Sequence, residues 1–546
     1  MFKIKKSGNF IFLALVLIHL IPIWAFDYFP SQDGPAHIEN ASVIRNYHHP
    51  DGSILRTYYT FNNKFTPTWF GHLILVGLMY IVPAVIAEKI FLTLYIILFP
   101  ISVRYALSAM RSDNSFLAYM SFPFIYNYTL NLGFYSFCLS LSLYFFMVGY
   151  WLKNQDHFNF QKILILTFLS ILLYFFHVVS LAMAYLGIAI LTIWQVSLDF
   201  ICDGHSIKSR CTKLWKILSR RALTVFIAFL PTLILLMIFM QPRGTKIKLS
   251  RSLGETLYML RDLLQIEALV SFQRPEFWLS LALGIVFWAI FLYIAISKTV
   301  HRQFDRADGI LFVISAYVLI FMLSPEGIGK FGIITPRLNL YPFFVLIIWF
   351  GAYPYHEIVK RTIILVAIAI TLTSWGFLMT KYAELNDYME EYLSGQELIQ
   401  PNTTILPVSF SSNGFSPDGK TLAIKAKPFL HASGYIAAEK KVVEFTNYEA
   451  GEFDWFPMVF REELNPYLHI AIDYYGLEEE PPRIEFLTYP ERTGGQVDYV
   501  LVWAVQEHQL NLEATRSIFR QIEEGFRLIY TSPRYGMMKL YQRKDP

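Results

Sequence analysis

Long apolar runs, separated by short polar segments, dominate the first 380 residues of the chain. Most of them are about as long as the roughly 20 residues that a helix needs to cross the hydrocarbon core of a bilayer. The clear runs are 10–26, 90–108, 131–151, 162–177, 179–197, 222–240, 277–297, 309–323, 338–353 and 362–380. Two further segments are less regular, because 69–87 contains Pro83 and 115–128 is short. The pattern predicts a polytopic α-helical membrane protein.

Basic residues between the runs predict the orientation, since cytoplasmic loops carry an excess of Lys and Arg. The N-terminus begins with three lysines in six residues, and the loops 204–221, 298–306 and 356–361 are also basic. All four segments are therefore expected on the cytoplasmic side.

The number of crossings follows from that side assignment. If all twelve segments crossed, loop 204–221 would face outward. About eleven crossings, with 69–87 lying at the membrane interface, keep the later basic loops inside and the C-terminus outside. A non-crossing 115–128 would do the same, but it would leave Arg104 and Arg111 outside.

Composition supports the membrane class, with 55% hydrophobic and only 16% charged residues and a mean hydropathy of +0.40. The net charge of +4 is unevenly distributed. Residues 381–546 hold 16 basic and 25 acidic residues, a net of −9, so the rest has a net of +13. This basic excess is scattered between apolar runs, which indicates a lipid bilayer as partner and no nucleic acid.

The composition changes after residue 380, which divides the chain into a transmembrane domain, 1–380, and an external α/β domain, 381–546. The segments 403–410, 435–445 and 499–505 are predicted strands, rich in β-branched and aromatic residues. Residues 510–524 have the period of an amphipathic helix. Residues 527–530 and 537–543 are predicted to form a terminal hairpin.

Candidate chemistry begins directly after the first apolar run, in the sequence Asp-Tyr-Phe-Pro-Ser-Gln-Asp-Gly-Pro-Ala-His-Ile-Glu-Asn-Ala from Asp27. Asp33 precedes Gly-Pro, which suits a helix N-cap. A partly desolvated carboxylate there could also act as a general base. His37 follows one helical turn later on the same face, whereas Glu39 points elsewhere and is expected to be solvated.

This stretch resembles the first external loop, here residues 27–89, of the GT-C superfamily of integral-membrane glycosyltransferases. Within that superfamily it resembles the aminoarabinose transferase or protein mannosyltransferase type. The resemblance implies a GT-C-like fold with interfacial helices. It also implies inverting transfer of a sugar from a polyprenyl-phosphate-linked donor to a glycan, lipid or protein acceptor on the external face. Asp33 would be the base and His37 its neighbour.

A second candidate site lies in loop 324–337, where glycines accompany Glu326, Lys330 and Arg337. The two cations suit the phosphate of the carrier lipid, and arginine offers bidentate contacts. The resemblance implies the same, since GT-C enzymes use basic residues of late external loops in this way. Glu326 is a candidate contact for the substrate.

Sugar-binding candidates come from two other turns. Tyr126, Asn127 and Tyr128 offer aromatic rings and an amide, although interfacial anchoring would explain the tyrosines equally. His177 marks the midpoint of an apolar stretch long enough for two helices.

No cofactor is required by these residues, but a divalent metal ion, Mg or Mn, could bind with Asp33 as a ligand. The absence of Asp and Glu between Ser115 and Lys153 counts against a two-carboxylate metal site. A transporter or flippase for lipid-linked glycans, or an inactive GT-C-fold scaffold, are the alternative functions. Compact loops favour a bacterial cytoplasmic (inner) membrane with a cytoplasmic N-terminus and a periplasmic C-terminal domain.

Overall fold

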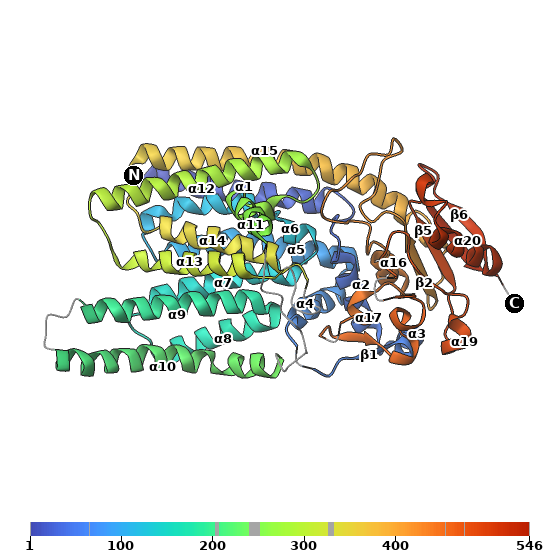
Figure 1. The fold of residues 1–546 in the computed structure, drawn as a ribbon, viewed down its shortest axis with the longest axis horizontal. Coiled ribbons are helices and arrows are strands. Elements are labelled where there is room, and N and C mark those ends of the chain that lie inside the picture. Colours follow the sequence, from blue (N-terminus) through green and yellow to red (C-terminus); the bar gives the residue numbers. More distant parts are fainter. Residues whose placement is uncertain are drawn as a thin grey trace.

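The computed structural model describes residues 2–64, 66–201, 207–239, 252–325, 332–453, 455–473 and 476–544. Long helices run side by side along one axis, and a mixed α/β region covers one end of them (Figure 1). The long helices are α1 (Phe2–Trp24), α5 (Ala84–Leu107), α7 (Tyr135–Asn154), α8 (Phe160–Phe176), α9 (Val178–Ile201), α10 (Ile207–Phe239), α12 (Arg274–Val300), α13 (Ile310–Leu323), α14 (Ile334–Phe350) and α15 (Glu357–Leu393). Each contains most of one predicted apolar run, so these helix predictions are confirmed.

The outer face of this helical bundle is apolar. Among the described residues, seven helices are long and apolar enough to cross a membrane, and four more are apolar but shorter. Large side chains such as Trp278 (67% exposed) and Ile358 (80% exposed) point away from the core. Apolar surface on this scale is unusual for a monomer in water, which favours lipid around the bundle.

The two uncertain segments fold differently from each other. Residues 69–79 form α4 (Trp69–Met79), which at 1.5 Å per residue is only about 16 Å long. Residues 112–124 form the 3₁₀ helix η2 (Ser112–Phe124), which returns along α5. Asn114 near its start donates to the Gly351 carbonyl at 2.9 Å, and the Ile125 carbonyl beyond its end accepts from the Tyr95 hydroxyl at 3.1 Å.

The first loop, residues 25–83 between α1 and α5, lies at the α/β end of the bundle (Figure 1). Besides α4 it contains α2 (Gly34–Asn46), η1 (Pro50–Gly52), α3 (Ser53–Tyr58) and β1 (Tyr59–Phe61). Pro35 in the first turn of α2 suits a helix start, because its missing N–H would be unpaired there in any case. Strand β1 pairs antiparallel with β4 (Met458–Phe460), so the first loop shares a sheet with the C-terminal region.

The C-terminal region, residues 394–544, is built on a five-stranded sheet of order β3-β2-β5-β7-β6. The strands are β2 (Thr404–Ser409), β3 (Val443–Glu444), β5 (Tyr499–Trp503), β6 (Phe526–Thr531) and β7 (Met538–Arg543). Strands β3, β2 and β5 are parallel, and the β6–β7 hairpin adds antiparallel to β5. The main helices are α16 (Ser433–Lys440), α17 (Tyr448–Gly451) and α20 (Glu513–Gly525). The short elements of this region are η5 (Gln396–Leu398), η6 (Glu462–Leu464), α18 (Pro466–His469), α19 (Tyr489–Thr493) and η7 (Glu507–Gln509). Outside it, the connections between the long helices contain α6 (Tyr128–Asn131), α11 (Leu253–Leu264), η3 (Glu267–Leu269) and η4 (Arg306–Gly309).

The predicted strands 403–410 and 499–505, the helix 510–524 and the terminal hairpin are confirmed. The predicted strand 435–445 is wrong, because residues 433–440 form α16 and only two residues pair as β3. Ala437, Ala438 and Glu439 are strong helix formers, and the helix packs against α2.

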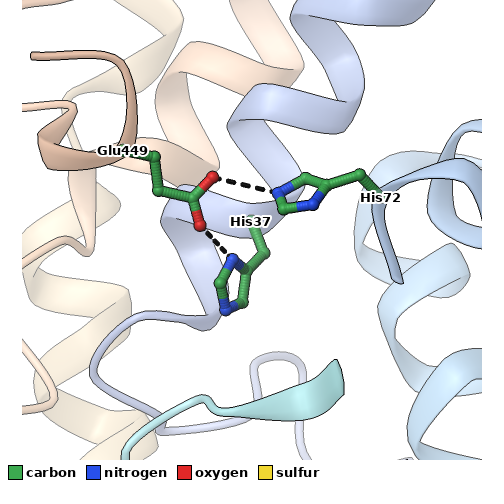
Figure 2. Close-up of side chains that lie close together, drawn as sticks. All are labelled: His37, His72 and Glu449. Atoms are coloured by element: carbon green, nitrogen blue, oxygen red, sulfur yellow. Dashed lines mark hydrogen bonds and ion pairs between the residues drawn. The ribbon is translucent and has the colours of Figure 1, made fainter. Parts of the chain in front are cut away.

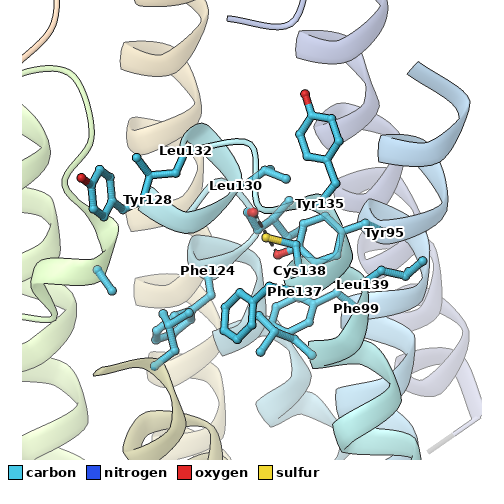
Figure 3. Close-up of a cluster of buried hydrophobic side chains, with 14 of the residues drawn as sticks. Tyr95, Phe99, Phe124, Tyr128, Leu130, Leu132, Tyr135, Phe137, Cys138 and Leu139 are labelled. Atoms are coloured by element: carbon cyan, nitrogen blue, oxygen red, sulfur yellow. Dashed lines mark hydrogen bonds between the residues drawn. The ribbon is translucent and has the colours of Figure 1, made fainter. Parts of the chain in front are cut away.

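A single buried core joins the bundle to the sheet. It includes Tyr95 and Phe99 of α5, Phe137 of α7 and, in the C-terminal region, Tyr435 and Trp503. Figure 3 shows its centre, where aromatic rings fill the space between the helices. The predicted domain boundary at residue 380 lies inside the continuous helix α15.

Close backbone contact between α16 and α2 generates a test of this packing. A Cβ at Gly434 would lie 2.5 Å from the Pro35 carbonyl oxygen, which is backbone and cannot move aside cheaply. We expect Gly434→Ala to destabilise the protein by about 1–3 kcal/mol through overpacking. Thermal unfolding followed by tryptophan fluorescence would measure the loss. Gly77→Ala in α4 is the control, since a Cβ there has no atom within 4 Å among the described residues. An equal effect of both substitutions would contradict the tight α16–α2 contact.

Candidate functional site

Asp33 lies at the N-cap of α2, between the bundle and the C-terminal region. Its side chain is 8% exposed and makes no capping hydrogen bond to its own helix. The Oδ1 atom accepts from Gln32 Nε2 at 3.0 Å, and His431 Nε2 lies 3.9 Å away. The Tyr448 hydroxyl is also within hydrogen-bonding reach. The carboxylate is therefore held by side chains of two regions that are about 400 residues apart.

The turn after α6 fixes the backbone of Asp33. The amides of Gln32 and Asp33 donate to the carbonyls of Asn131 and Leu132, both at 3.1 Å. Gly133 has a φ of +84°, and a Cβ there would lie 2.4 Å from the nitrogen of the residue after Asp33. Only glycine allows this close approach.

His37 is one turn further along α2 and faces Glu449 of α17 (Figure 2). Its Nδ1 contacts Glu449 Oε1, while His72 Nε2 of α4 lies 2.9 Å from Oε2. Asn40 Nδ2 donates to the same Oε2 at 2.7 Å. One ligand atom from each of His37, His72 and Glu449 lies within 4.8 Å of the others, so this group has the composition and spacing to hold a metal ion.

The two carboxylates of the site have opposite pKa shifts. Burial raises the pKa of Asp33 to about 6, against smaller opposing effects of His37 and Gln32. Burial also acts to raise the pKa of Glu449, but the charges and hydrogen bonds of His37 and His72 outweigh it and lower this pKa to about 2. Burial acts to lower the pKa of His37, yet Glu449 raises it overall.

Arg337, at the start of α14, approaches the same place. Its guanidinium lies 4.1 Å from the ring centroid of Phe134 and 5.8 Å from that of Phe137. Within the described part of the chain, its hydrogen bond goes to the Gly332 carbonyl at a long 3.4 Å. The Asp33 carboxylate is close enough to act on it electrostatically. The structure thus brings together two predicted residues that are 304 positions apart (337 − 33).

Of the other residues predicted to contact the substrate, some lie near Asp33 and others make contacts that stabilise the fold. Tyr128 lies near Asp33, with Lys425 Nζ 4.4 Å from its ring centroid. Asn127 caps α6 by accepting from the Leu130 amide at 3.2 Å, so its side-chain oxygen serves the fold. The Tyr126 hydroxyl donates to the His19 carbonyl inside the bundle.

His177 joins α8 to α9, and its Nδ1 accepts from the Val179 amide at 3.2 Å. Its ring packs on Phe137, one of the two rings beside Arg337, so it borders the site indirectly. Glu326 and Lys330 lie outside the residues that the structure describes.

Several residues of the site were not predicted from the sequence: His72, His431, Tyr448 and Glu449. A histidine inside the apolar segment 69–87 was the available signal for His72, whereas nothing in the local sequence marks Glu449. The prediction that Glu39 is solvated is wrong. It is 1% exposed and accepts from the Tyr59 hydroxyl at 3.2 Å, because the C-terminal region covers this face of α2.

Comparisons of the sequence with protein-family models and with curated proteins give no match. The function is therefore argued from the geometry of the site.

The buried His431 generates a prediction about acid stability. Burial lowers its pKa to about 3, with Glu449 opposing this shift and His37 and Lys427 adding to it. An unfolded histidine titrates near 6.5. As the pH falls from 6.5 toward 3, the unfolded chain binds a proton that the folded chain excludes, so stability decreases.

We expect the melting temperature of His431→Gln to fall less than that of the wild type between pH 7 and pH 5. His301→Gln, at the exposed C-cap of α12, is the control and should keep the wild-type slope. A wild-type slope in His431→Gln would mean that His431 is charged in the folded protein. Thermal scans at several pH values would measure these slopes.

Proposed function

We propose that the protein is an integral-membrane glycosyltransferase of the GT-C type. It transfers a sugar, with inversion, from a polyprenyl-phosphate-linked donor to a glycan, lipid or protein acceptor on the external face. The observation that carries this proposal is that the Arg337 guanidinium packs on Phe134, two residues after the Leu132 carbonyl that accepts from the Asp33 amide, and acts electrostatically on the Asp33 carboxylate. A base and a phosphate ligand must be close together for this reaction.

Asp33 is the general base in this proposal. Its carboxylate takes the proton of the acceptor hydroxyl as the acceptor oxygen bonds to the anomeric carbon of the donor sugar. The bond from that carbon to the phosphate oxygen breaks, and the carrier phosphate leaves with the electron pair. A single displacement of this kind inverts the anomeric carbon. A base with a pKa of about 6 is still ionised at neutral pH and is more basic than an exposed aspartate.

Arg337 is the ligand for the leaving phosphate. Arg337 is half-buried, and a guanidinium removed even partly from water is costly unless an anion or several acceptors surround it. Among the described residues its hydrogen bond is a long one and its Nε has no partner, so the guanidinium has capacity for a further acceptor. A phosphate would supply the missing charge and accept two parallel hydrogen bonds. Lys330 would add a second cation, and Tyr128 with Lys425 would offer a surface for the sugar.

The membrane arrangement belongs to the same proposal. The chain crosses about eleven times, with α4 at the external interface and η2 as the return crossing after α5. The shortness of α4 and the path of η2 support this assignment over its alternative. The N-terminus is cytoplasmic and the C-terminal region periplasmic, in a bacterial inner membrane.

The role of Asp33 can be tested by measuring transfer of labelled sugar from polyprenyl-phosphate donors in membranes. We expect Asp33→Asn to reduce the rate by about 10²–10⁴-fold, which is the usual contribution of a general base. Asp27→Asn, an exposed aspartate in the same loop, is the matched control and should retain activity. Equal activity of both variants would remove Asp33 from the chemistry. No transfer by the wild type over a broad donor set would favour a transporter, flippase or inactive scaffold.

The role of Arg337 can be tested by donor kinetics. Arg337→Gln removes the charge, and Arg337→Lys keeps it but loses the bidentate geometry. We expect the KM for the donor to rise by about 10–100-fold in Arg337→Gln, from the loss of charge-assisted hydrogen bonds, and by less in Arg337→Lys. The KM for the acceptor should change little. An equal rise in both KM values would indicate a general packing defect instead of phosphate binding.

A further inference from the structure

We propose that His37, His72 and Glu449 form a binding site for one divalent transition-metal ion of the Zn²⁺ class. This site joins the first loop to the C-terminal region. The proposal is independent of the glycosyltransferase assignment, because it rests on the ligand set alone. The proposed site is also distinct from a magnesium site with Asp33 as ligand, because Asp33 does not belong to this group of three residues.

The donor set determines the class of ion. Two imidazole nitrogens and one carboxylate oxygen come from α2, α4 and α17, and Glu449 and His72 are almost completely buried. Imidazole ligands suit zinc and neighbouring transition metals, whereas magnesium prefers oxygen ligands and retained waters. Two histidines with one glutamate is a known ligand set for zinc sites that keep an open position.

A hydrogen bond of His72 indicates which of its nitrogens faces the carboxylate. His72 Nδ1 lies 3.3 Å from the Thr68 carbonyl. A neutral imidazole has one N–H, and a carbonyl can only accept. In a neutral His72 the proton is therefore on Nδ1, and Nε2 directs a lone pair at Glu449, 2.9 Å away. Metal-binding histidines usually donate their other N–H to a carbonyl or carboxylate in this way.

A lone pair directed at a buried carboxylate repels it unless positive charge lies between them. Asn40 already supplies a donor to Oε2. His37 Nδ1 and Glu449 Oε1 are in contact, yet neither has a partner with hydrogen-bond geometry among the described residues. A shared cation satisfies all three groups at once. The alternative source of this positive charge is protonation of the rings, and the metal content of the purified protein distinguishes the two.

A small cavity adjoins the two imidazoles. Its volume is about 10 Å³, and it is lined by His37, His72, Gly71 and Tyr135, among others. This is about the space that one water molecule needs. The cavity therefore offers a position for a water as the fourth ligand of a three-residue metal site.

Metal content of the full-length protein, purified in detergent, tests the proposal directly. The protein is stripped with a chelator, incubated with ZnCl₂, desalted and measured by mass spectrometry of the metal. We expect one zinc per chain in the wild type, and a visible Co²⁺ spectrum with imidazole character after reloading with cobalt. His72→Asn keeps a donor for the Thr68 carbonyl and removes the ligand atom Nε2. Loss of an outer-shell partner alone usually weakens metal binding by about 10–100-fold, so we expect loss of this ligand to weaken zinc binding by at least about 100-fold.

His19→Asn is the matched control, since His19 is equally buried and its Nδ1 also bonds the carbonyl four residues earlier, at 2.7 Å. It should retain one zinc per chain. If His72→Asn does not fold, Glu449→Gln replaces it as the ligand variant. The zinc content of the reloaded wild type tests the proposal in either case. Absence of stoichiometric zinc in the reloaded wild type, or equal binding by wild type and His72→Asn, would overturn the proposal. Neither result depends on a transfer assay.

Discussion

The pairing of the buried Glu449 carboxylate is the interaction on which the first loop and the C-terminal region depend. This carboxylate is fully buried and meets His37, His72 and Asn40, all from the first loop. A buried charge without partners is strongly destabilising, so α17 and the first loop must fold against each other. Asp33 lies one turn before His37 on the same helix. The pairing of Glu449 therefore also fixes the position of the candidate base.

A second buried carboxylate ties this assembly to the bundle. Glu88 of α5 accepts from the hydroxyls of Tyr135 in α7 and Tyr435 in α16. Ser31 lies 2.7 Å from the Tyr135 hydroxyl, just before Asp33. The bundle, the first loop and the C-terminal region thus meet around one polar network, with aromatic core on either side. Groups held from three directions keep their geometry, which catalysis by positioned residues requires.

The sequence predicts the features that depend on local pattern. Apolar runs of membrane length predict the long helices, and β-branched runs predict β2 and β5. Residues 435–445 were misassigned because their aromatic and β-branched ends conceal the helix formers between them. Asp33, His37 and Arg337 were identifiable because each follows or begins an apolar run. Glu449 and His431 were not, since their significance arises only from contacts with α2, about 400 residues away.

Asp33 and Glu449 show how one site gives two carboxylates different chemistry. Both are buried, and burial alone would raise both pKa values. The charges and hydrogen bonds of His37 and His72 outweigh burial at Glu449 and lower its pKa to about 2. Asp33 has Gln32 and a more distant His431, and its pKa rises to about 6. A carboxylate that stays ionised suits ligand binding, whereas one that titrates near neutral pH suits proton transfer. The difference between the two pKa values follows from the partners that each carboxylate receives.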